Sequence, residues 1–386
     1  MVDQEAHVGL PILDLSDAND PVKHTALLDQ LHDALFNIGF LYIKNHGVAE
    51  ETISNLASLL PVLFEQPPEA KASLSKLNSP HFLGYSGYAE ETTLGEKDLR
   101  EQFDLATELP VVWSPSANST SQDRESKSKR DFSKLYWRLR GPNQWPSEGN
   151  VPGFRKAYTE YHDALQELSY RFVHLIEEAF GIPVGTFDAF FPSPKSVDAA
   201  GHKYVPPQHR IKLVKYPPSP SSGGDEHDQG VGAHKDSSGW LTLLYQVGQE
   251  EGLEVHVNGE WISAPPIDGT FVVNFGNAFE VATEGAVKAT VHRVKAPMSI
   301  SNARYSIPFF QGLPLDLTVS EIRSCIPESV RKLRRSVKLG PSESVSTFLD
   351  PRWDSLGESQ LRKWIRSHED VGRKWYGDDV SKFYLE

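Results

Sequence analysis

Hydrophobic residues recur at helical spacing in the first half of the chain. Leucines and an isoleucine at intervals of three and four residues predict a helix from Asp20 to Gly39, and a longer periodic run predicts a helix over 153–180. Residues 50–75 predict a second helical stretch, interrupted near Pro67-Pro68. The apolar runs GLPILD (9–14) and FLYIKNHG (40–47) predict short strands.

The pattern changes after residue 205, where short apolar runs rich in β-branched and aromatic residues alternate with turn signals such as Asn258-Gly259 and Asp268-Gly269. Several short strands separated by turns are typical of a sandwich or barrel. The runs are IKLVKY, WLTLLYQ, LEVHV, TFVVNFG, ATVHRV and RYSIPFF.

These patterns predict a mainly β core with flanking helices. Residues 114–130 contain a single hydrophobic residue and predict an exposed loop, whereas residues 313–386 return to a helical pattern. We therefore expect five regions: a mixed α/β N-terminal region (1–110), an exposed loop (111–130), helical support (131–204), the β core (205–312) and a helical C-terminal region (313–386).

Composition narrows the classes of function. The net charge of −13 disfavours nucleic acid and anionic membranes as partners, and the basic run 331–338 is expected to be a solvated helix face. The single cysteine, Cys325, excludes an intramolecular disulfide and a multi-cysteine metal site; we expect it to be packed. The sequence has no run of about 18 apolar residues and no recognisable leader, so we expect a cytoplasmic protein.

A candidate metal site begins with His234 and Asp236. Residues i and i+2 of an extended segment point to the same side, so this imidazole and this carboxylate converge. His292 lies in the apolar run ATVHRV, which carries it toward the core. Two histidines and one carboxylate with open positions are the ligand set of non-haem iron(II) oxygenases, although zinc also accepts these ligands. The chain has 14 histidines, so the triplet alone could also arise by chance.

A candidate anion site follows. Arg304 and Ser306 share one face of the strand RYSIPFF, and a guanidinium binds a carboxylate through two parallel hydrogen bonds. Tyr216, in LVKYPP, is a candidate third donor. The order His-x-Asp, His, Arg-x-Ser is more informative than any one of these residues.

With this order in place, HKDSSGWLTLL, GTFVVNFGNAFEVATEGAVKATVHRV and RYSIPFF together resemble the isopenicillin N synthase-like branch of the iron(II)/2-oxoglutarate-dependent dioxygenases. The N-terminal LPILDLS and GFLYIKNHGV, and the middle segments GYSGYAEETTLGEKDLREQFDLATELP and GPNQWP, resemble the same branch, so the similarity spans nearly the whole chain. The resemblance implies a double-stranded β-helix, or jelly roll.

It further implies iron(II) bound by His234, Asp236 and His292, and 2-oxoglutarate bound by Arg304 and Ser306 with Tyr216 nearby. Dioxygen would be the oxidant, and ascorbate an accessory reductant. Many relatives carry Asn two residues before this tyrosine, whereas this chain has Val214, which weakens the assignment of Tyr216.

The expected reaction is oxidation of a small organic molecule by hydroxylation, desaturation or ring formation, in secondary metabolism. Four aromatic residues are candidate substrate contacts, and each could equally be a packing residue: Tyr85, Tyr88, Phe103 and Phe310. Three alternatives stay open: a 2-oxoglutarate-independent oxidase of the isopenicillin N synthase type, an ethylene-forming type, and a non-catalytic jelly-roll binding protein. The sequence gives neither the substrate nor the oligomeric state.

Overall fold

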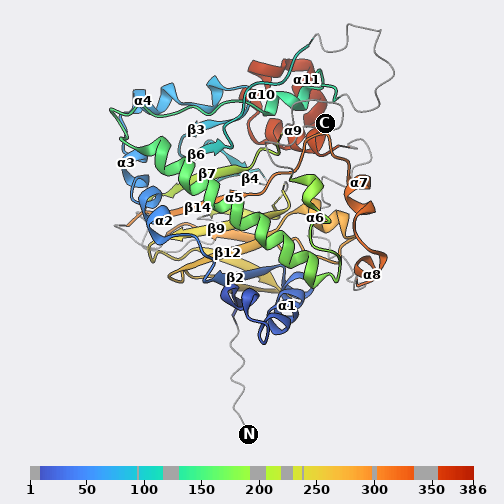
Figure 1. Ribbon diagram of the computed structural model, residues 1–386. Helices are drawn as coiled ribbons and strands as arrows, with labels where there is room; N and C mark the ends of the chain where they lie inside the picture. Colours follow the sequence, from blue (N-terminus) through green and yellow to red (C-terminus); the bar gives the residue numbers. More distant parts are fainter. Residues whose placement is uncertain are drawn as a thin grey trace, which may run out of the picture.

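Two β-sheets pack against each other in the computed structural model (Figure 1). The structure describes residues 9–93, 95–115, 130–191, 206–218, 229–236, 239–297, 302–333 and 355–386. The larger sheet has the strand order β1-β2-β12-β9-β14-β7-β6-β3 and the smaller one β11-β10-β13-β8. Apolar side chains from both sheets form one cluster between them. This is the jelly-roll arrangement that the sequence predicted, and the fold class is confirmed.

The strands of the larger sheet are β1 (Ile12–Asp14), β2 (Phe40–Lys44), β12 (Thr270–Phe275), β9 (Leu241–Val247), β14 (Arg304–Phe310), β7 (Arg210–Tyr216), β6 (Glu101–Ala106) and β3 (Gly84–Ser86). Those of the smaller sheet are β11 (Glu260–Ser263), β10 (Leu253–Val257), β13 (His292–Lys295) and β8 (Gln229–His234). Two further strands of two residues each, β4 (Thr92–Thr93) and β5 (Glu96–Lys97), pair with each other in a separate antiparallel hairpin.

Alternation along the strands separates two environments. On β14, Ile307 and Phe309 pack into the main core, whereas Arg304, Ser306 and Phe310 face the space between the sheets. A strand exposes successive side chains on opposite sides, so one strand can contribute both a core residue and a site residue. The larger sheet thus has an apolar outer face and an inner face that carries the polar groups.

Helices cover the apolar outer face. The long helix α5 (Phe154–Ala179) crosses it, next to α1 (His24–Asp33) and α2 (Glu50–Ala57) (Figure 1). The predicted helix over 153–180 is confirmed, and Gly181 follows its end at a φ of +67°, a conformation that favours glycine. The predicted stretch 50–75 is broken into α2, α3 (Leu60–Phe64) and α4 (Pro68–Ser73).

The C-terminal helices close one end of the molecule (Figure 1). A second apolar cluster joins Trp364 and Ile365 to Phe82 and Trp137, which lie far away in the sequence. The helices are α9 (Leu356–Ser367), α10 (Glu369–Tyr376) and α11 (Asp378–Leu385); the shorter α6 (Asn277–Ala282), α7 (Val319–Ser324) and α8 (Glu328–Arg331) precede them in the chain. None of the described helices combines the length and the hydropathy that crossing a bilayer requires.

The sequence interpretation missed strand β8. Gln229–His234 is a strand that pairs with β13, and it is not among the runs from which strands were predicted. Glycine is needed there for space: a Cβ on Gly230 would lie 2.9 Å from a ring carbon of Tyr216. Cys325 is partly buried against the main core, as expected. Most of the predicted loop 111–130 and of the basic run 331–338 lies outside the described residues.

Candidate active site

The structure brings His234, Asp236 and His292 together. His234 ends β8, His292 begins β13, and these two residues are direct partners in the antiparallel pair. The Asp236 Oδ1 atom lies 3.9 Å from the His234 Nε2 atom and 3.7 Å from the His292 Nε2 atom. One ligand atom from each residue lies within 4.8 Å of the other two, so the three could bind one metal ion.

The backbone orients both imidazoles. The Nδ1 atom of His234 lies 2.7 Å from the carbonyl oxygen of Gly232, and that of His292 lies 3.0 Å from the carbonyl oxygen of Thr290. A carbonyl oxygen only accepts hydrogen bonds, so each Nδ1 carries the hydrogen and donates it. Each Nε2 lone pair is then free to bind a metal, and the hydrogen bond fixes the tautomer and the ring orientation.

Two donors hold the Asp236 carboxylate. Its Oδ2 atom accepts hydrogen bonds of 2.6 Å from the Thr242 Oγ1 atom and of 2.6 Å from the Asn274 Nδ2 atom. Oδ1 is left facing the two histidines. Thr242 on β9 and Asn274 on β12 are also direct partners across the sheet. The sequence interpretation missed both, although each occupies an inward position in the alternating pattern of its strand.

The site favours a neutral His234 imidazole beside an ionised Asp236 carboxylate. Burial, reinforced by the neighbouring His292, lowers the pKa of His234 to about 3. Burial alone would raise the pKa of Asp236, but the two histidines and the hydrogen bonds from Thr242 and Asn274 outweigh it and lower that pKa. Neutral imidazole and ionised carboxylate are the forms that bind a metal.

The candidate anion site lies on the same inner face. Arg304 is 1 % exposed, its Nη2 atom donates to the Gln246 Oε1 atom at 2.8 Å, and its guanidinium lies 5.0 Å from the centre of the Tyr216 ring. Its Nε and Nη1 atoms are buried and have no hydrogen-bond partner among the described residues. Ser306 follows on the same face and is also buried. A buried guanidinium with unused donors fits a bound carboxylate.

One cavity connects the two sites. Its volume is about 290 Å³, and its walls include the three candidate metal ligands together with Arg304 and Ser306. Tyr216 and Val214 also line it, so the valine that replaces the family's asparagine faces the cavity. A common cavity allows a molecule held at Arg304 to reach a metal held by the histidines.

The four candidate substrate contacts lie in different parts of the structure. Phe310 lines the cavity. Phe103 lies in the main core, with its ring 4.9 Å from that of Tyr85, because its position on β6 points to the outer face. The Tyr85 hydroxyl donates to the Glu101 Oε2 atom at 2.7 Å, and Tyr88 is 54 % exposed. Tyr85, Tyr88 and Phe103 are not among the described residues that line this cavity, and their role in substrate contact stays a prediction.

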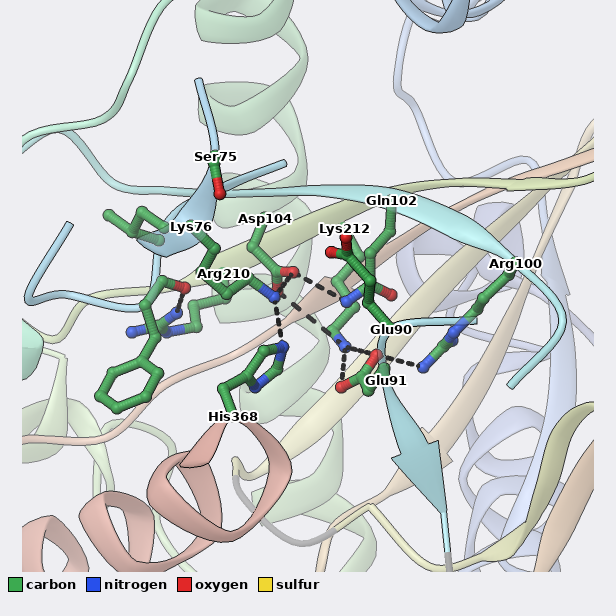
Figure 2. A network of polar contacts seen from close by, with 12 residues as sticks. Ser75, Lys76, Glu90, Glu91, Arg100, Gln102, Asp104, Arg210, Lys212 and His368 are labelled. Carbon is green, nitrogen blue, oxygen red and sulfur yellow. Dashed lines mark hydrogen bonds and ion pairs between the residues drawn. The ribbon is translucent and has the colours of Figure 1, made fainter. Parts of the chain in front are cut away.

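Charged side chains that the sequence did not point to also line the cavity, among them Glu91, Arg100 and Lys212. Glu91 accepts from the Arg100 Nη2 atom at 2.7 Å and forms an ion pair of 3.3 Å with Lys212. Figure 2 shows this group continuing to Asp104, which pairs with the Lys76 Nζ atom at 2.7 Å. These residues come from β6, β7 and the segments before β3, β4 and β6, so only the folded chain brings them together.

The chain matches two protein families. Residues 10–148 match the family described as "non-haem dioxygenase in morphine synthesis N-terminal", and residues 207–312 match the "2OG-Fe(II) oxygenase superfamily". The chain is 40 % identical over 371 residues to the 2-oxoglutarate-dependent dioxygenase frbJ of Dothideomycetidae sp. (strain 11243), a match that covers 95 % of this chain and 91 % of that protein.

Two further likenesses extend the comparison. The chain is 28 % identical over 330 residues to the homoarginine-6-hydroxylase 2-ODD-C23.1 of Arabidopsis thaliana, which covers 82 % of this chain and 88 % of that protein. Its fold is similar to that of Neurospora crassa T7H in complex with alpha-KG and thymine, with a TM-score of 0.63 at 23 % identity over 83 % of this chain and 91 % of that one.

Proposed function

Since the chain belongs to the 2OG-Fe(II) oxygenase superfamily and is a 2-oxoglutarate-dependent dioxygenase, we infer that His234, Asp236 and His292 are the ligands of its iron(II). Arg304 and Ser306 hold the distal carboxylate of 2-oxoglutarate, with the Tyr216 ring packed beside the guanidinium. The observation that supports this assignment best is the shared cavity, which has the triad in its wall and a buried arginine with unused donors.

In this proposal the triad binds the metal, and Arg304 binds the keto acid. The two histidines and Asp236 offer three ligand atoms from one side, which leaves positions for the keto acid and for dioxygen. Arg304 fixes the distance between the keto acid's far end and the metal. When bound, iron(II) and 2-oxoglutarate supply the oxidation of a C–H bond by dioxygen, with release of succinate and carbon dioxide. Zinc would fit the triad too, but the anion site beside it is the feature that a keto acid requires.

The substrate of this proposal is a small organic molecule that enters the same cavity. Phe310 contacts it, because this ring lies on the cavity wall and on the strand that also carries Arg304. Homoarginine, after which one group of relatives is named, is a small organic molecule. We also retain the proposal that residues 205–312 form the catalytic core and that 1–110, 131–204 and 313–386 support it.

The test is turnover of purified, iron-loaded protein, followed as succinate formed from 2-oxoglutarate. We expect His234→Ala and Asp236→Ala to abolish succinate formation and to weaken iron binding. His174→Ala is the matched control, because this histidine lies on the outer helix α5 and its side chain is 39 % exposed. Wild-type turnover in His234→Ala would contradict the assignment.

A further inference from the structure

Lys363 is a cation in the cavity wall that has no ionic partner among the described residues. It lies on α9 and lines the main cavity as well as a smaller hollow of about 30 Å³. The other lysines of the main cavity are paired: Lys212 with Glu91 at 3.3 Å, and Lys235 with Glu280 at 3.0 Å. Lys363 therefore carries a charge that a ligand in the cavity could neutralise.

Other positive groups surround this lysine. The Arg210 guanidinium donates to the carbonyl oxygens of His81 and Phe82, at 2.8 and 3.1 Å, and lies 4.2 Å from the Trp364 ring centre, and no carboxylate in the described part of the chain forms an ion pair with it either. Burial, reinforced by the charge of Lys212, lowers the pKa of Lys363 to about 8, whereas Asp236 and Glu91 act in the opposite direction. At neutral pH the ammonium form still predominates.

The helix directs a polar face at the cavity. Gln360, Lys363, Trp364 and Ser367 follow one another at intervals of three, one and three residues, which places them on one side of α9. Gln360 and Trp364 line the smaller hollow, Ser367 lines the main cavity, and Lys363 lines both. This side of the helix therefore borders a space that a ligand can enter.

Lys363 and Arg304 lie toward different ends of this space. Lys363 shares both hollows with Phe310, and Phe310 is six residues from Arg304 on β14, about 20 Å along an extended strand. Phe310 is the direct partner of Thr242, which holds Asp236. The level of Phe310 is thus the level of the metal ligands, with Arg304 further along the strand.

We propose that the primary substrate carries a carboxylate that pairs with Lys363, and that this ion pair positions the substrate's oxidised carbon at the metal. The inference rests on the proposed function and names the substrate class for that site. A single ammonium group with one glutamine and one serine on the same helix face matches a monoanion. Arg304 serves the keto acid, and Lys363 serves the molecule that is oxidised.

The test uses a panel of small carboxylic acids, each with its primary amide, in the presence of iron(II) and 2-oxoglutarate. Succinate formation and calorimetric binding are both followed. We expect acids to bind and stimulate turnover where their amides do not. Lys363→Met should raise the Michaelis constant for a stimulating acid at least about tenfold, the loss expected for a charge-assisted contact. The Michaelis constant for the keto acid should not change.

Two variants separate this role from a structural one. Lys363→Arg keeps the charge and should restore most of the acid affinity, whereas Arg366→Met removes an exposed charge from the same helix and should change nothing. Should Lys363→Met lower the melting temperature, Lys363→Gln replaces it in the assay. Amides that work as well as acids, no stimulating acid in the panel, or a loss of 2-oxoglutarate affinity in Lys363→Met would each overturn the proposal.

Failure of the wider assignment would look different. Wild-type protein that binds neither iron nor 2-oxoglutarate would refute the proposed function itself. Wild-type protein that binds both and prefers neutral substrates would refute only the role of Lys363.

Discussion

Thr242→Val tests how the protein holds its candidate carboxylate ligand. The substitution keeps the shape of the side chain and removes one hydroxyl, which donates to the Asp236 Oδ2 atom at 2.6 Å in a buried environment. A hydrogen bond to a charged group contributes about 1.5–3 kcal/mol. Asn274 still donates to the same oxygen at 2.6 Å, so the carboxylate keeps one of its two anchors.

We therefore expect iron(II) affinity to fall about 10- to 100-fold, the range for loss of a group that orients a ligand. Saturating iron should restore most of the turnover, because the three candidate ligands remain. The affinity is measured under argon by competition with a chelator of known strength. Thr270→Val is the matched control: this threonine is buried on β12 and its hydroxyl donates to the carbonyl oxygen of Ile267 at 2.7 Å. Equal iron affinity in wild type and Thr242→Val would refute the argument that Thr242 orients the ligand.

Three further predictions follow from contacts described above. Arg304→Ala should raise the Michaelis constant for the keto acid at least about 30-fold, because it truncates a buried charge pair, and should leave iron bound; an unchanged constant in a steady-state assay would contradict the anchor. Lys76→Met should lower the unfolding free energy by about 3 kcal/mol in urea titrations, because it leaves the buried Asp104 without its 2.7 Å partner, whereas the exposed Lys156→Met should change it little. For acid substrates, kcat/KM should fall as pH rises past about 8, because Lys363 then loses its charge; a flat profile to about pH 9 would oppose this.

The sequence was informative where one strand carries several site residues. Arg304, Ser306 and Phe310 share a face because they differ by even numbers, and their common placement on the cavity wall follows from the pleat of a single strand. The same rule accounts for the position of Phe103 in the main core, away from the cavity. Its neighbours on β6 alternate in the same way, but nothing in the local sequence says which face of the strand looks inward.

Residues that meet only after folding were beyond the sequence. Glu91 and Lys212 form one ion pair in the cavity wall, although Glu91 precedes the long helix α5 in the sequence and Lys212 follows it. Lys363, from the C-terminal region, lines the same wall. Strand β8 was missed for a related reason. Its glycines are typical of a loop in the sequence. Only the fold, which packs the Tyr216 ring of another strand against Gly230, explains why a side chain would not fit there.

The central claim is that one cavity holds iron between His234, Asp236 and His292 and holds 2-oxoglutarate between that iron and Arg304. Anaerobic calorimetric titration of 2-oxoglutarate into iron-loaded and iron-free protein tests it most directly. The account predicts one equivalent of tight binding that requires iron, and much weaker binding in Arg304→Ala. Binding of equal strength without iron, or in Arg304→Ala with iron present, would contradict it.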